Sequence, residues 1–144
     1  MKFITKSVEE TIKLGFSLGK LLNIGDIVAF TGTLASGKTC FTKGLALGLE
    51  IEEEITSPTF TIISEYYGRL PLYHFDLYRL TSFEDFLEIG GEEYLYGDGV
   101  CAIEWSEKII KELPKNAITI DIIINENDCR VININNLPDN YLIK

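Results

Sequence analysis

The pattern of apolar and polar positions predicts helices and short buried strands in alternation. Apolar residues recur close to helical spacing over residues 8–22, and Ser7 with Glu10 forms a capping box where this helix begins. The apolar run at residues 27–30 predicts a buried strand, and residues 39–49 predict a second helix. We therefore expect the first third of the chain to fold as helix, strand and helix.

The rest of the chain continues this pattern and adds two hairpins. Gly68 separates the first pair of strands, residues 125–128 separate the last pair, and Pro114 ends the last helix. The elements expected here are strands at 60–67, 72–76, 100–104, 118–124 and 131–134, helices at 82–89 and 106–113, and a glycine-rich loop at 90–99. This order predicts an α/β protein with a mainly parallel sheet and antiparallel hairpins, and 144 residues fit a single domain, residues 1–144.

A glycine-rich segment lies between the first strand and the second helix. It satisfies the pattern G-x-x-x-x-G-K-[ST], the signature of a phosphate-binding loop. Its residues are Gly32, Thr33, Leu34, Ala35, Ser36, Gly37, Lys38 and Thr39. Glycines let successive backbone N–H groups point at phosphate oxygens, and the helix that follows adds its free amides and positive dipole end. The segment predicts a nucleotide-binding site in a three-layer P-loop NTPase fold.

Two side chains of this loop have separate roles in the predicted chemistry. Lys38 brings a positive charge to the β- and γ-phosphates, and the Thr39 hydroxyl is placed to bind Mg²⁺. We expect hydrolysis of ATP assisted by Mg²⁺, although the loop motif by itself does not select the base.

A P-loop protein also needs a carboxylate at the end of a neighbouring strand to hold Mg²⁺ or its waters. Two predicted strands end in one, at Glu104 and at Asp76. We assign Glu104 to the metal together with Thr39. Asp76 is expected near the γ-phosphate, either on the metal or orienting the attacking water. With Lys38, these two carboxylates are the predicted catalytic residues.

Some further positions near the site allow more than one interpretation. Ser57 and Thr59 flank Pro58 in a loop, where hydroxyls either sense a γ-phosphate, as in switch loops, or simply turn the chain. His74 lies between apolar neighbours, which favours a structural histidine over a general base. Trp105 comes directly after the second carboxylate and either lines the nucleotide site or fills the core, and we favour the core.

The charge balance argues against direct binding of nucleic acid. The chain has 22 acidic residues against 13 Lys and Arg, a net charge of −9, and its arginines are only Arg69, Arg79 and Arg130. Affinity for nucleic acid depends largely on cations that neutralise phosphates. We therefore expect a partner to hold any nucleic acid that is involved.

Cysteine usage and hydropathy bear on location. The three cysteines lack C-x-x-C spacing and indicate neither a disulfide framework nor a zinc site, and Cys101 is expected to be a small buried residue. The first ten residues lack the apolar stretch of a signal peptide, and no run of 18 apolar residues occurs. These features predict a cytoplasmic protein without membrane association.

Three other functions were weighed against an ATPase. A GTPase usually carries an Asn-Lys-x-Asp motif, which this chain lacks. A small kinase closes an arginine-bearing lid over the phosphates, and three arginines leave little for one. A nucleotide-sensing module that docks to partners without turnover stays open, although the presence of both Asp76 and Glu104 favours hydrolysis.

Four segments in this order resemble the TsaE (YjeE) family of small bacterial ATPases. They are GTLASGKTCFTKGLALGL, SPTFTI, YHFDLYRL and IEW. The resemblance spans nearly the whole chain, and YHFDLYRL is its most specific part because generic P-loop proteins lack it. The family is needed to make N6-threonylcarbamoyladenosine on tRNA.

The resemblance implies a function beyond the residues themselves. Family members act with TsaB and TsaD in a complex that transfers a threonylcarbamoyl group to adenosine 37 of tRNA. ATP hydrolysis is expected to reset that complex, and tRNA is contacted only through it. The implied site has Lys38 on phosphates, Thr39 and Glu104 on Mg²⁺, Asp76 in hydrolysis, Ser57 and Thr59 in a switch-like loop, and nucleoside contacts near the helix at Ser7.

Two positions depart from the family pattern. Ala35 stands where the family loop, usually LGAGKT, has a glycine, and Ser106 stands where a proline follows the tryptophan. If the backbone at residue 35 requires a positive φ, alanine costs roughly 1–2 kcal/mol there. Such strain would weaken nucleotide affinity without changing the assignment.

Overall fold

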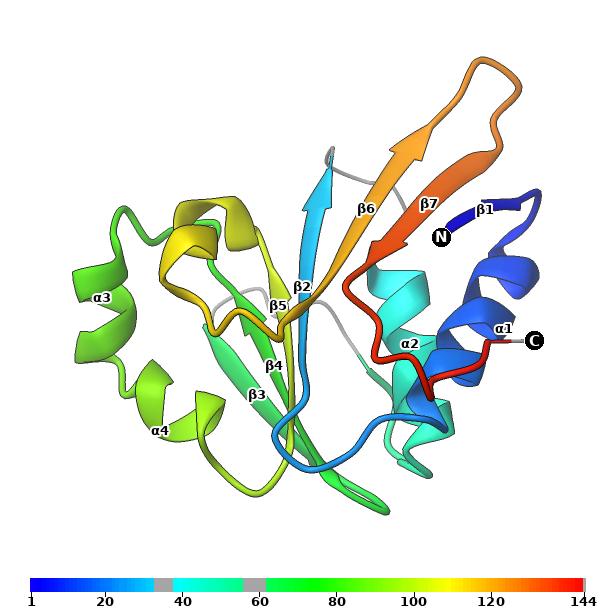
Figure 1. Cartoon of the computed structure of the whole chain (residues 1–144). Helices are drawn as coiled ribbons and strands as arrows, with labels where there is room; N and C mark the ends of the chain where they lie inside the picture. The colour runs from blue at the N-terminus through cyan, green and yellow to red at the C-terminus, as the bar shows by residue number, and fades with distance from the viewer. Residues whose placement is uncertain (33–37, 56–61, 144) are drawn as a thin grey trace.

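A single mixed sheet forms the centre of the protein (Figure 1). The structure is a computed structural model that describes residues 1–32, 38–55 and 62–143. The strands are β1 (Lys2–Thr5), β2 (Ile27–Gly32), β3 (Ile63–Tyr67), β4 (Pro71–Asp76), β5 (Val100–Glu104), β6 (Ile118–Ile124) and β7 (Arg130–Asn135), in the order β1-β7-β6-β2-β5-β4-β3. The four middle strands run parallel, and the outer pairs β1–β7, β6–β7 and β3–β4 are antiparallel. The predicted α/β class, with a parallel centre and antiparallel hairpins, is confirmed.

Helices cover both faces of this sheet, as Figure 1 shows. On one face lie α1 (Val8–Gly19) and α2 (Lys38–Gly48), and on the other lie α3 (Phe83–Glu88) and α4 (Gly91–Leu95). Side chains alternate along β2, so Val28 and Phe30 pack toward α1 and α2, whereas Ile27 and Ala29 pack toward α3 and α4. The two apolar cores confirm the predicted three-layer arrangement. No helix in the described part of the chain is long and apolar enough to cross a membrane.

Glycines bring the backbones of α1 and α2 into direct contact. The contact positions are Gly15, Gly19, Gly44 and Gly48, all of them buried. A Cβ atom on Gly15 would lie 2.3 Å from the carbonyl oxygen of Phe41, and one on Gly44 would lie 2.1 Å from that of Ile12. Glycine costs about 1 kcal/mol relative to alanine in a helix interior, so this close packing offsets a weak intrinsic helix propensity. The start of α2 is thereby held against α1.

The end of α1 is closed by an arginine from the β3–β4 turn. The guanidinium of Arg69 donates hydrogen bonds to the carbonyl oxygens of Gly19 and Leu22, at 3.0 and 3.3 Å. Cations near a helix C-terminus satisfy carbonyl groups that lack helical partners. One of the three arginines is therefore structural, and the helix ends at Gly19 rather than at residue 22 as predicted.

Helix starts were predicted well from local signals. The Ser7 hydroxyl accepts a hydrogen bond from the amide of Glu10 at 3.1 Å, which confirms the predicted cap. Ser82 caps α3 in the same way through the amide of Asp85. The second predicted helix agrees with α2 within one residue at each end.

The prediction of a helix at residues 106–113 is wrong. Two short 3₁₀ helices, Ser106–Lys108 and Ile110–Glu112, occupy that segment. Trp105 takes a left-handed conformation with φ 62°, and Ile109 interrupts the helical path with φ −133°. The buried Ser106 hydroxyl donates to the carbonyl oxygen of Phe30 at 2.8 Å and so ties the segment to β2.

Two elements were missed by the pattern of the sequence. Strand β1 pairs with β7 at the edge of the sheet, and the Met1 ammonium donates to the carbonyl oxygen of Ile134 at 2.7 Å. Helix α4 falls in the predicted glycine-rich loop, where Gly90 with φ 82° turns the chain into it. Both elements are too short to show a clear periodicity in the sequence, since β1 has 4 residues and α4 has 5. In addition, β1 depends on pairing with β7 at the other end of the chain.

Candidate functional site

The carboxyl ends of the parallel strands meet at one edge of the sheet, which is where α2 begins. Strand β2 lies between β6 and β5, and β5 pairs with β4. Gly32 is the last residue of β2, and Lys38 and Thr39 open α2. Ligands of open α/β sheets bind at such an edge. The other predicted loop positions, Thr33, Leu34, Ala35, Ser36 and Gly37, and the predicted Ser57 and Thr59, lie outside the described residues.

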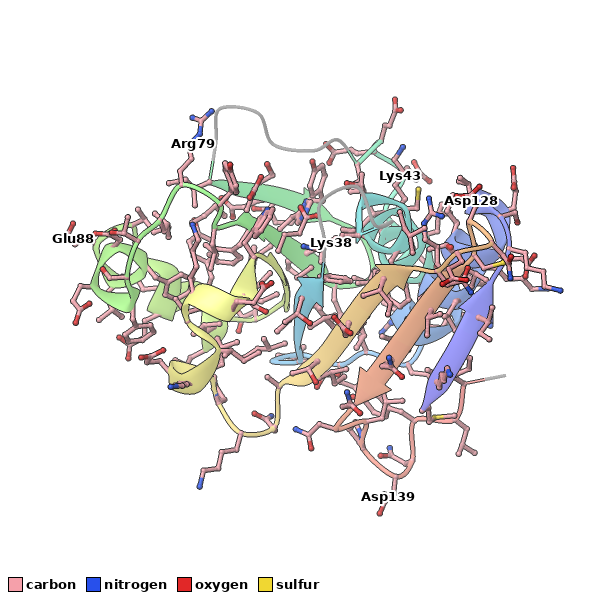
Figure 2. All side chains as sticks on the ribbon, turned by 90° about the horizontal axis from the view of Figure 1, so that it is seen from above. Lys38, Lys43, Arg79, Glu88, Asp128 and Asp139 are labelled. Atoms are coloured by element: carbon pink, nitrogen blue, oxygen red, sulfur yellow. The ribbon has the colours of Figure 1, made fainter. Side chains whose placement is uncertain are left out.

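Lys38 carries a buried positive charge at the start of α2. Its residue is 6% exposed, and its Nζ has no hydrogen-bond partner among the described residues. The ammonium lies 4.4 Å from the centre of the Trp105 ring, a cation–π contact. Figure 2 shows Lys38 beside the end of β2. A buried charge whose one recorded contact is a ring face is poorly compensated, so this site is suited to an anionic ligand.

The two predicted carboxylates lie next to one another. Asp76 and Glu104 are partners in the parallel register of β4 and β5. Glu104 is on the same strand face as Val100 and Ala102, which pack in the α1–α2 core, so it faces the helix that carries Lys38. Glu104 is 6% exposed, whereas Asp76 is half-buried. The Glu104 carboxylate is therefore largely shielded from water, whereas solvent reaches the carboxylate of Asp76.

His74 holds the buried carboxylate. Its Nε2 lies 2.9 Å from Oε2 of Glu104, and its side chain is fully buried. This position agrees with the structural role favoured for His74. Sequence reasoning did not predict its partner, but the spacing of two residues from Asp76 was a usable signal, because it puts both side chains on one strand face.

Aromatic and basic side chains fix the chain beyond Asp76. The Trp105 ring packs at 5.0 Å from that of Tyr78, whose amide donates to the Asp76 carboxylate at 3.1 Å. Lys108 donates to the carbonyl oxygen of Leu80 at 2.7 Å and also to that of Tyr78. Trp105 is half-buried against the α3–α4 core, in agreement with the core position that the sequence favoured, and its ring also contacts the Lys38 ammonium.

A cavity of about 330 Å³ opens beside the start of α2. Its lining residues are Lys6, Ser7, Val8, Thr11, Cys40, Ile124, Asp128 and Arg130. They come from the start of α1, from α2 and from the tip of the β6–β7 hairpin. Small-molecule pockets usually measure about 300–1,000 Å³, so this cavity has room for a compact ligand. Sequence reasoning pointed to the Ser7 region alone and missed the hairpin residues.

Other chemistry can be set aside at the described residues. Burial raises the pKa of the Cys101 thiol to about 12, so this cysteine is not a nucleophile near neutral pH. No group of three His, Cys, Asp or Glu side chains is placed to hold a metal within residues 1–32, 38–55 and 62–143. Mg²⁺ is commonly held by one or two carboxylates together with substrate phosphates. The Thr39 hydroxyl and the buried Glu104 carboxylate fit that donor set.

A strand, a phosphate-loop motif and a helix, with two carboxylates at the adjoining strand ends, define a P-loop protein of the α/β class. The chain belongs to the TsaE family, described as "Threonylcarbamoyl adenosine biosynthesis protein TsaE", which matches residues 5–132. The resemblance drawn from the four sequence segments is thereby confirmed.

Relatives cover most of the chain. A protein of Treponema pallidum named "tRNA threonylcarbamoyladenosine biosynthesis protein TsaE" is 54% identical over 122 residues, 85% of this chain and 90% of the relative. The Bacillus subtilis protein of the same name is 39% identical over 142 residues, 98% of this chain and 89% of the relative. The crystal structure of Bacillus subtilis YdiB has a TM-score of 0.76 and 40% identity, over 92% of this chain and 82% of that one.

Proposed function

We propose that this protein binds ATP and hydrolyses it with Mg²⁺, in the service of the threonylcarbamoyl modification of adenosine 37 in tRNA. The observation that carries the proposal is the buried Lys38 ammonium. It lies at the first residue of α2, over the ring of the residue that follows Glu104, and lacks a hydrogen-bond acceptor among the described residues. A triphosphate would supply the missing oxygens.

In this proposal the side chains of the site have separate roles in hydrolysis. Thr39 and Glu104 would hold Mg²⁺, which would neutralise charge that develops on the phosphates. Lys38 would stabilise the same charge from the loop side. The half-buried Asp76 is suited to orient the attacking water, because solvent reaches it and its neighbour Glu104 is already engaged by His74.

The cavity between α1, α2 and the hairpin tip is our proposed site for the nucleoside. Cys40 lines this cavity and comes directly after Thr39 in α2, so the cavity lies beside the start of the helix that would hold the phosphates and Mg²⁺. A base there would contact both ends of the chain, since Ser7 and Arg130 line the same space. This arrangement agrees with nucleoside contacts near the start of α1.

Protein partners complete the proposed role. We propose that the TsaB–TsaD complex binds the tRNA, because a net charge of −9 and a small number of arginines make this chain a poor binder of phosphate backbones. The names of the relatives place them in the same tRNA modification. P-loop hydrolysis is often slow until a partner supplies charge or orders the loops. We expect the cytoplasm to be the site of this activity.

The test of this proposal is phosphate release from ATP and from GTP, with and without Mg²⁺. We expect release that is selective for ATP, weak in the isolated protein, and increased on the order of tenfold or more by TsaB, TsaD and tRNA together. If ATP binds but no condition yields phosphate, the protein is a nucleotide sensor and the hydrolytic role is wrong. Fast turnover that ignores the partners would contradict the partner dependence.

The nucleoside cavity has its own prediction. Ile124→Trp is expected to weaken ATP binding about tenfold or more, because the larger ring would fill space at the end of β6 that the base needs. Binding of inorganic triphosphate with Mg²⁺ should stay the same, since neither Lys38 nor the proposed Mg²⁺ ligands line this cavity. Calorimetric titration with both ligands measures the difference.

Ile123→Trp is the matched control for that substitution. Ile123 and Ile124 are both 41% exposed and adjacent, but they lie on opposite faces of β6, and only Ile124 lines the cavity. We expect Ile123→Trp to bind ATP like the unmodified protein. Equal losses in both variants, or a matching loss of triphosphate binding, would place the base elsewhere.

A further inference from the structure

His74 and Glu104 form a hydrogen-bonded pair between neighbouring strands of the sheet. Both residues face the α1–α2 side of neighbouring parallel strands, and His74 lies two positions before the register pair of Asp76 with Glu104. The His74 side chain is fully buried, and that of Glu104 is 8% exposed. The contact of 2.9 Å is therefore shielded from water, where hydrogen bonds to a charged group are strong.

The chemistry of the pair fixes which atom carries the proton. An ionised carboxylate only accepts hydrogen bonds, so Nε2 of His74 must donate to Glu104. Nδ1 is buried and has no hydrogen-bond partner among the described residues. A neutral ring protonated on Nε2 leaves only an acceptor unsatisfied there, rather than a buried N–H or a second charge.

This hydrogen bond orients the carboxylate. With Oε2 held by His74, rotation of the Glu104 side chain is restricted and Oε1 is left for a cation. Side chains that orient a metal ligand typically change metal affinity about 10–100-fold. We infer that His74 is a positioning residue that sets the Mg²⁺ affinity of the nucleotide site through Glu104. The inference rests on the proposed function, in which Glu104 binds Mg²⁺.

The test compares three variants by calorimetric titration of ATP, in EDTA and over a range of Mg²⁺ concentrations. His74→Leu is expected to raise the Mg²⁺ concentration of half-maximal effect about tenfold or more, with ATP affinity in EDTA unchanged. His74→Gln should restore much of the Mg²⁺ response, because its amide donates from near the position of Nε2. Leu72→Val is the matched control.

Leu72 lies on the same face of β4, two residues earlier, and is also fully buried. Leu72→Val should lower the melting temperature and leave the Mg²⁺ response as it was. A normal Mg²⁺ response in His74→Leu, or an equal loss in Leu72→Val, would overturn the inference and leave the proposed ATP site intact. If the unmodified protein binds ATP without any response to Mg²⁺, the proposed metal site fails, and the inference fails with it.

A second measurement does not depend on the stability of variants. The chain has one histidine, so a long-range ¹H–¹⁵N correlation spectrum reports its ring without ambiguity. We expect a proton on Nε2 in the nucleotide-free protein. A neutral ring protonated on Nδ1 would overturn the inference, because that form cannot donate to Glu104.

Discussion

Lys38→Ala is expected to abolish measurable ATP binding, with a dissociation constant raised about 100-fold or more. Lys38 is the buried ammonium at the start of α2 and has no acceptor among the described residues, so its charge is available for the phosphates. Calorimetry measures the affinity. The free energy of unfolding should change by only about 1 kcal/mol, since one cation–π contact is the interaction lost.

Lys43→Ala controls for the loss of a lysine from the same helix. Lys43 is half-buried five residues later, and Figure 2 shows it farther out along α2 than Lys38. Affinity for ATP should stay within about twofold, because the field of a charge that solvent reaches is screened over about 10 Å. Comparable losses in both variants would mean that general charge, rather than a phosphate contact, explains the effect of Lys38→Ala.

Glu104→Gln and Asp76→Asn are each expected to lower the rate of ATP hydrolysis about 100-fold or more while nucleotide still binds. Glutamine at 104 can still accept the hydrogen bond from His74, so the fold should survive, but it lacks the charge that Mg²⁺ requires. Asparagine at 76 keeps the shape of the side chain and loses the anion beside the proposed water. Single-turnover phosphate release separates the chemical step from binding.

Glu107→Gln is the corresponding control for a lost carboxylate. Glu107 is exposed, three residues beyond Glu104 and outside the sheet edge. Its substitution should leave turnover unchanged, because no hydrogen bond or ion pair joins Glu107 to the described residues of the site. Full activity in either Glu104→Gln or Asp76→Asn, with a cooperative melt in both, would remove that residue from the mechanism.

The site was predictable where it depends on residues near in sequence. The motif at residues 32–39 was expected to follow a strand and to open a helix. The structure has β2 before it and α2 after it. Asp76 and Glu104 were predicted to lie together because parallel strands end at a common edge, and the structure places them side by side in the register of β4 and β5. Helix starts followed from hydroxyl caps, which act over three residues.

Contacts between distant residues were beyond that reasoning. The cavity is lined by both Ser7 and Arg130, and the periodicity of the sequence does not show that the tip of the β6–β7 hairpin lies beside the start of α1. The His74–Glu104 hydrogen bond needs the order of strands, which a pattern of apolar residues does not contain. The segment after Trp105 was mistaken for a helix because its tie to Phe30 competes with local propensity.

The four buried glycines between α1 and α2 limit which substitutions this sequence can accept during evolution. They lie where backbone meets backbone, and none of them lines the nucleoside cavity. Any side chain there would separate the two helices, and the helix starts that they carry, one at Ser7 and one at Lys38, would lose their mutual spacing. Variation in a lineage is thus constrained at interior positions that touch no ligand, while those outward-facing residues of the same two helices that do not line the proposed site remain free to change.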